Sequence, residues 1–138
     1  MDEKGFELEA GAKLENLPAM IDFVIGSLKK LGVDDHSTFD IQLAVDEISA
    51  NVIRYAYKDK PGRIWLACRR DANAILITIR DEGYPFDPTR VPPPDLDADL
   101  EHRKPGGLGI YLAKQVMDTI AYTYECGQNV LTMKKFIK

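Results

Sequence analysis

The stretch IQLAVDEISANVIRYAY, residues 41–57, decides the fold. Read as a helix, it repeats apolar side chains at the spacing of a buried face: Ile41, Val45, Ile48, Val52 and Ala56. A polar stripe borders that face, within about 60° of arc at about 100° per residue, and holds Asp40, Glu47, Asn51 and Arg54. The carboxylate of Glu47 and the amide of Asn51 therefore lie one turn apart at the margin of a core. A solvated helix face is the ordinary interpretation of such a pair, and only the sequence downstream favours a site.

The composition is that of an ordinary soluble globular protein. The chain has 138 residues, 45% of them hydrophobic and 29% charged, with a formal net charge of -4. This length predicts one domain over residues 1–138. The negative charge argues against direct nucleic-acid binding, and no apolar run approaches the roughly 20 residues of a membrane span. The acidic, alternating N-terminus is not a signal peptide. Two widely spaced cysteines, with no histidine beside them, favour a cytoplasmic setting and no thiolate metal site.

The chain predicts five strands and three helices. Asn16 is expected to cap a helix that ends at Gly32, and the long helix of residues 41–57 comes after a short turn. Alternating apolar residues and tight turns predict strands over residues 5–9, 63–70, 74–80, 120–125 and 130–136, and a third helix begins near Ile110. Strands joined by tight turns are antiparallel. We therefore expect an α+β fold, a two-layer sandwich of a mixed, mostly antiparallel sheet covered on one face by three helices.

Two glycine-containing motifs come after the strands. Asp81-Glu82-Gly83 lies at the end of a strand, where it is usually a simple turn. Gly106-Gly107-Leu108-Gly109 opens the third helix, where it is often a flexible hinge. It also exposes N–H groups at the positive end of a helix dipole, which suits a phosphate. Neither motif is a P-loop. The long, proline-rich and acidic segment between them is of a kind that is usually functional or disordered.

In this order, the three pieces resemble the Bergerat-fold (GHKL) ATPases, which include gyrase, Hsp90, histidine kinases and MutL. Within them the chain looks most like the anti-sigma-factor serine/threonine-protein kinases of bacterial partner switching. AVDEISANVIRYAY is similar to the family's N box, DEGYPFDP to its first glycine box and GGLGIYLAKQVMD to its second. The resemblance covers essentially the whole chain. It departs at Tyr55, where many relatives have histidine, and at Pro85, where they often have glycine.

The resemblance implies a site for ATP and Mg²⁺. Asn51 would ligate the metal, Asp81 would accept a hydrogen bond from the adenine amino group, and Glu47 would be the catalytic general base. Residues of about 84–106 would form the lid over the nucleotide. The ATP-binding residues implied are Asn51, Asp81, Gly83, Gly106, Gly107, Leu108, Gly109 and Thr132.

The resemblance also implies a function and partners. The chain would phosphorylate an anti-sigma-factor antagonist of the STAS type and would bind a sigma factor. The alternative is a non-catalytic, ATP-gated anti-sigma or adaptor module, and a detached histidine-kinase domain is a weaker third interpretation. A homodimer remains open. So does the choice, for Arg54, Arg103 and Lys104, between neutralising a γ-phosphate and being solvated charges.

Overall fold

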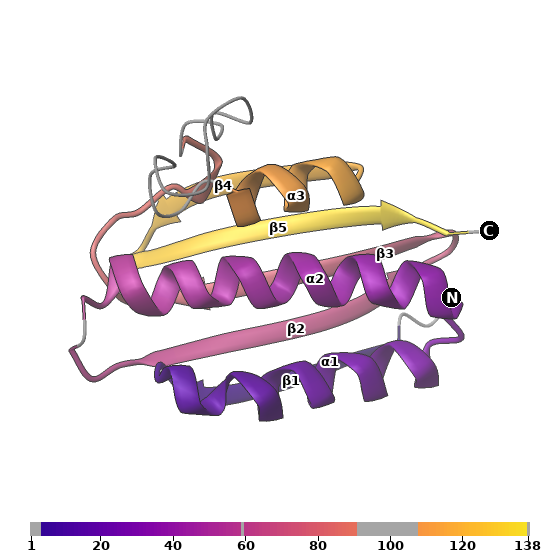
Figure 1. Ribbon diagram of the computed structural model, residues 1–138, viewed down its shortest axis with the longest axis horizontal. Helices are drawn as coiled ribbons and strands as arrows, with labels where there is room; N and C mark the ends of the chain where they lie inside the picture. The colour runs from indigo at the N-terminus through magenta and orange to yellow at the C-terminus, as the bar shows by residue number, and fades with distance from the viewer. Residues whose placement is uncertain (1–3, 59, 91–107, 138) are drawn as a thin grey trace, which may run out of the picture.

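The computed structural model describes residues 4–58, 60–90 and 108–137, and it has two layers (Figure 1). Three α-helices lie on one face of a single five-stranded sheet. The strands are β1 (Lys4–Gly11), β2 (Arg63–Asp71), β3 (Ala74–Asp81), β4 (Thr119–Glu125) and β5 (Gln128–Phe136). The helices are α1 (Leu17–Lys30), α2 (Asp35–Asn51) and α3 (Leu108–Val116), with short turns η1 (Leu14–Asn16), η2 (Val52–Ala56) and η3 (Pro88–Arg90). The expected α+β sandwich is confirmed.

The sheet has the strand order β1-β2-β3-β5-β4, so β4 and β1 form its edges. All four described strand pairs are antiparallel, and the sheet is therefore not mixed in the part of the chain described. β5 lies between β3 and β4 although β4 precedes it in the chain. This order places Asp81, the last residue of β3, directly opposite Asn129 of β5.

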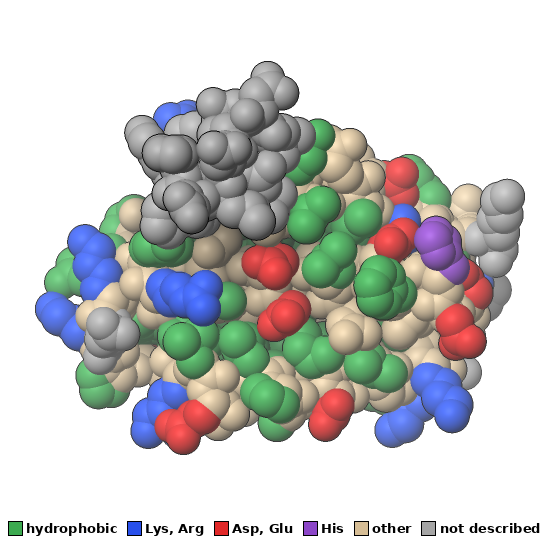
Figure 2. Space-filling view, viewed as in Figure 1, with side chains coloured by type: hydrophobic (Ala, Val, Ile, Leu, Met, Phe, Trp, Pro, Cys, Tyr) green, Lys and Arg blue, Asp and Glu red, His purple; other side chains and the backbone are tan. Residues whose placement is uncertain are grey.

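The core lies between the sheet and the helices. Strand residues alternate between the two faces, and the helix-facing set in β2 and β3 is almost fully buried: Ile64, Leu66, Cys68, Ile75, Ile77 and Ile79. The apolar stripe expected on the central helix is buried as well, at 4% exposure or less for each member: Ile41, Val45, Ile48, Val52 and Ala56. Outside this core, hydrophobic and acidic side chains are interspersed over the outer surface of the helices (Figure 2).

The first helix begins differently from the expectation. Asn16 has helical dihedral angles, φ -88° and ψ -8°, and its side chain caps no amide of α1. Its Nδ2 instead donates to the carbonyl oxygen of Gly11 at 2.8 Å. The reason is that η1 runs directly into α1, so the chain is already helical where an N-cap residue would be extended. Gly32 ends the helix as expected, with φ +78°.

The central helix has two ends of different character. Its start is capped by Asp34, whose Oδ2 accepts from the Ser37 amide at 3.0 Å. At the other end α2 passes into the π turn Val52–Ala56, in which the amide of Tyr57 donates to the carbonyl oxygen of Val52 at 3.2 Å. A π turn adds a residue to one turn and so rotates the later residues about the helix axis. The described helices include none that is both long and apolar enough to cross a membrane.

Candidate functional site

The N-terminal end of α3 lies against the side of α2, and Glu47 of α2 is in contact with it. A Cβ built on Gly109 would lie 2.1 Å from Oε2 of Glu47 and 2.7 Å from its Cδ. The carboxylate therefore occupies the space that any side chain at position 109 would need. The structure thus brings together Glu47 and Gly109, two of the residues that the sequence assigned to one site.

Asn51 lies one turn beyond Glu47, as the last residue of α2. The residue is only 7% exposed, but its side-chain amide is not among the fully buried polar atoms that lack a hydrogen-bond partner in the described part of the chain. The Asn51 oxygen is a hard ligand of the type Mg²⁺ prefers. The described part of the chain contains no cluster of three or more His, Cys, Asp or Glu residues that could hold a metal alone.

Asp81 is buried at the end of β3, with 1% exposure. Its Oδ1 accepts two hydrogen bonds, from the Gly83 amide at 2.9 Å and from Nδ2 of Asn129 at 2.8 Å. Burial raises the pKa of this carboxyl, and the bonds from Asn129 and Gly83 oppose that rise. The second carboxylate oxygen accepts no hydrogen bond from the described residues. Asp81 thus offers one acceptor to a ligand while the other is held in place.

Gly83 contacts the end of the central helix. A Cβ there would lie 2.6 Å from the carbonyl oxygen of Ala56 and 2.7 Å from its carbonyl carbon, both backbone atoms. The next amide, that of Tyr84, donates to the same oxygen at 2.8 Å. Glycine is therefore required at position 83 because the loop after β3 packs directly on the backbone of the π turn.

Asn129 is a site residue that the sequence reasoning missed. Its Nδ2 donates to Oδ1 of Asp81 and to the carbonyl oxygen of Tyr84, both at 2.8 Å. Its Oδ1 accepts from the Phe86 amide at 3.0 Å and from the Tyr122 hydroxyl. The amide thus uses all four of its hydrogen-bonding positions. It joins Asp81 to the first residues of the segment expected to form a lid.

Thr132 does not join this group. It pairs with Thr78 on one side and Ala121 on the other, on the face of the sheet that carries no helices. Asn129 lies three residues earlier on β5, and an odd separation along a strand places two side chains on opposite faces. The interpretation of Thr132 as a neighbour of the ligand is therefore not supported by its position.

Some of the other expected site residues lie outside the described part of the chain, and others lie within it. Gly106, Gly107, Arg103 and Lys104 lie outside the described residues, and Leu108 is the first residue of α3. Asp40, on the same helical stripe as Glu47, pairs instead with Lys135 at 3.2 Å near the start of α2. The ionic contact of Asp40 joins α2 to β5 and is not part of the site.

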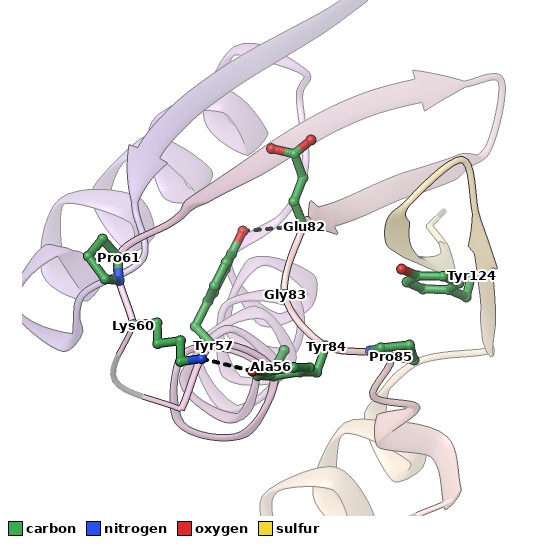
Figure 3. Close-up of a pocket in the computed structure, with 9 residues that line it drawn as sticks. All are labelled: Ala56, Tyr57, Lys60, Pro61, Glu82, Gly83, Tyr84, Pro85 and Tyr124. Carbon is green, nitrogen blue, oxygen red and sulfur yellow. Dashed lines mark hydrogen bonds between the residues drawn. The ribbon is translucent and has the colours of Figure 1, made fainter.

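The loop after β3 lines a cavity of about 290 Å³, drawn in Figure 3, to which Gly83 itself contributes. Tyr57 forms part of its wall, and its hydroxyl points toward the backbone of Glu82. The far wall includes the ring of Tyr124, from β4. The residues that directly follow Asp81, from Glu82 to Pro85, thus form part of the cavity wall.

The chain is similar to several known proteins. The family model for the histidine kinase-like ATPase domain matches residues 10–135. Serine-protein kinase RsbW of Bacillus cereus (strain AH820) is 29% identical over 136 residues, covering 96% of this chain and 84% of that protein. RsbW of Bacillus anthracis (strain A0248) matches with the same values.

A solved structure is also similar. The crystal structure of the RsbU and RsbW domains of Rv1364c from Mycobacterium tuberculosis aligns with a TM-score of 0.64 at 14% identity. The alignment covers 96% of this chain and 32% of that chain. At this identity the similarity shows a shared fold.

Proposed function

The chain belongs to the family of histidine kinase-like ATPase domains, and we propose that it is an ATP-dependent serine/threonine-protein kinase acting as an anti-sigma regulatory factor. The proposed substrate is a hydroxyl-bearing anti-sigma-factor antagonist of the STAS type, and a sigma factor is the proposed second partner. Relatives named serine-protein kinase, aligned over 96% of this chain, support the proposal.

The observation that carries the proposal is the position of Glu47. Its carboxylate lies at the start of α3, against Gly109, and Asn51 is one turn further along the same helix. A module that only bound a nucleotide would have no need of a carboxylate there. Phosphoryl transfer depends on positioning and charge stabilisation, so one base, one metal ligand and a set of backbone donors nearly suffice.

The residues present fit a magnesium-bound adenine nucleotide. The second carboxylate oxygen of Asp81 would accept from the adenine amino group, and the Asn51 oxygen would hold Mg²⁺. When bound, Mg²⁺ neutralises phosphate charge and lowers the barrier to transfer. The amides at the start of α3 would donate to phosphate oxygens. Glu47 would orient the substrate hydroxyl and take its proton at a carboxylate oxygen.

The test is transfer of labelled γ-phosphate from ATP to a purified STAS-type antagonist. We expect Glu47→Gln to lower the rate by about 10²–10⁴-fold, the range for loss of a general base, with ADP affinity nearly unchanged. Glu15→Gln, at an exposed glutamate of η1, is the matched control and should transfer at the wild-type rate.

The outcomes separate the two candidate functions. Equal transfer by wild type and Glu47→Gln would contradict the assignment of the base. ATP binding by the wild type without transfer to any antagonist would instead support a non-catalytic, ATP-gated module.

A further inference from the structure

The hydroxyl group of Tyr57 joins three backbone groups from two distant segments. It donates to the carbonyl oxygen of Arg63 at 2.5 Å and accepts from the amides of Arg63 at 3.2 Å and Glu82 at 2.8 Å. A phenol has one donor and two acceptor positions, so every position is used. Figure 3 shows the bond that reaches the loop after β3.

The ring of Tyr57 is held as firmly as its hydroxyl. The residue is 6% exposed. A Cβ on Gly62 would lie 2.1 Å from its Cε1 and 2.5 Å from its Cζ, so the ring occupies the space that a side chain at position 62 would need. The ring position and the hydroxyl contacts therefore fix each other.

The contact with Glu82 is one of two that fasten this loop to the end of the central helix. The other is the bond from the Tyr84 amide to the Ala56 carbonyl oxygen, at 2.8 Å. The two ties come from consecutive residues, 56 and 57, and reach positions on either side of Gly83. Asp81 adjoins the first of them. These two hydrogen bonds therefore hold the loop in place next to Asp81, whose carboxylate must be positioned accurately.

The π turn explains why Tyr57 can make this contact. One residue inserted into a turn rotates the later residues by about 100° relative to a continuous α-helix. In the structure the Tyr57 amide bonds to Val52, five residues earlier, and the side chain then points to the β2 and β3 ends. A continuous helix would direct the hydroxyl elsewhere.

We propose that Tyr57 is a positioning residue for base recognition, which holds the Glu82 amide and thereby fixes the carboxylate of Asp81 toward an adenine ring. This inference rests on the proposed function. Tyr57 touches no ligand itself and acts through the loop. Its loss should therefore weaken the choice of base more than it weakens the binding of phosphates.

The test compares Tyr57→Phe with Tyr124→Phe by calorimetric titration with ADP and with GDP. Guanine carries a carbonyl oxygen where adenine carries its amino group, so a fixed Asp81 carboxylate discriminates against it. Tyr57→Phe removes all three hydroxyl contacts, and we expect the lost bond to the Glu82 amide to raise the dissociation constant for ADP about tenfold and to change GDP binding little. Tyr124→Phe, in the same cavity but 44% exposed, should change neither.

Further measurements distinguish a local effect of Tyr57→Phe on the loop from a general loss of folding stability. Titrations run well below the melting temperature of each variant, and amide exchange should speed up at Glu82 but not at Ile48 of the core. Gly62→Ala, which keeps the hydroxyl but displaces the ring, should also weaken ADP binding selectively.

The results have distinct meanings. A wild type that prefers ADP, with Tyr57→Phe and Gly62→Ala keeping that preference, would overturn this inference alone. A wild type that binds neither nucleotide would overturn the proposed function and this inference with it.

Discussion

Replacing Gly109 with alanine tests how closely α3 approaches the central helix. A Cβ at this position would lie 2.1 Å from Oε2, 2.7 Å from Cδ and 3.0 Å from Cβ of Glu47. The first two atoms belong to the flexible end of the side chain and can swing aside. The third is fixed to the backbone of α2. The variant must therefore displace the Glu47 carboxylate and also separate the helices slightly.

The magnitude depends on two opposing effects. Overpacking of this kind costs about 1–3 kcal/mol, whereas alanine in place of glycine in a helix gains up to about 1 kcal/mol. We expect a net loss of roughly 0–2 kcal/mol, which lowers the melting temperature by up to about 8 °C. Phosphotransfer should fall much further, by about 100-fold, because a shift of about 1 Å in a catalytic group has that effect.

The assays are calorimetric unfolding and labelled phosphotransfer to a STAS-type antagonist. Gly26→Ala is the matched control, since a Cβ at this position meets no atom within 4 Å outside the adjoining backbone of α1. It should raise stability by about 0.5–1 kcal/mol and leave transfer unchanged. If Gly109→Ala kept the wild-type transfer rate, Glu47 would not act from the position described.

The remaining predictions concern buried polar groups. Burial raises the folded-state pKa of Asp81 above its ordinary 3.8, so its ionisation costs stability progressively as pH rises from the unfolded value through the folded one. Asp81→Asn should therefore unfold at a similar or higher temperature than wild type at pH 7 and lose that advantage near pH 3. It should also bind ADP far more weakly. A large destabilisation of Asp81→Asn at pH 7 would contradict the upward direction of the pKa shift. Asn129→Ala removes four hydrogen bonds and should cost roughly 2–3 kcal/mol by urea unfolding, and a cost below about 1 kcal/mol would refute its central role. Lys135→Met breaks a largely buried ion pair with Asp40 and a 2.7 Å bond to the Val116 carbonyl oxygen. It should cost about 1.5–3 kcal/mol, the range for hydrogen bonds to a charged group, and additivity with Asp40→Asn in a double-mutant cycle would show that the pair is uncoupled.

Helical and strand periodicity made most of the fold predictable. The buried stripe of the central helix is an immediate consequence of the 3.6-residue period, and each of its five members is buried. The tight turns likewise determined which strands pair as neighbours along the chain. The strand order was less accessible, because the placement of β5 between β3 and β4 depends on contacts between residues about 50 positions apart.

The proximity of two site residues was predictable from the sequence when both lie on one helix. It was less predictable when they lie on different strands. Glu47 and Asn51 share a helix, so their proximity is a matter of spacing. Asn129 reaches Asp81 only through the β3–β5 register, which local sequence does not specify. The same register places Thr132 on the other face.

Two other features could not have been read from the sequence. Asp40 shares the polar stripe of Asn51 but lies about 16 Å away along the helix axis, at 1.5 Å per residue, and pairs with Lys135 instead. The π turn Val52–Ala56 has no periodic signature, because a single extra residue in one turn disturbs the apolar pattern too little to be detected.

The central claim is that segments far apart in the sequence form one site for a magnesium-bound adenine nucleotide. Titration calorimetry with a non-hydrolysable ATP analogue tests it directly, for the wild type and for Asn51→Ala, each with Mg²⁺ and with EDTA. We expect one site per chain. Compared with the wild type in Mg²⁺, the affinity should be at least about tenfold weaker for the wild type in EDTA and for Asn51→Ala in Mg²⁺, the effect of losing one metal-ligand contact. Absence of binding by the wild type, or equal affinity under all four conditions, would contradict the claim.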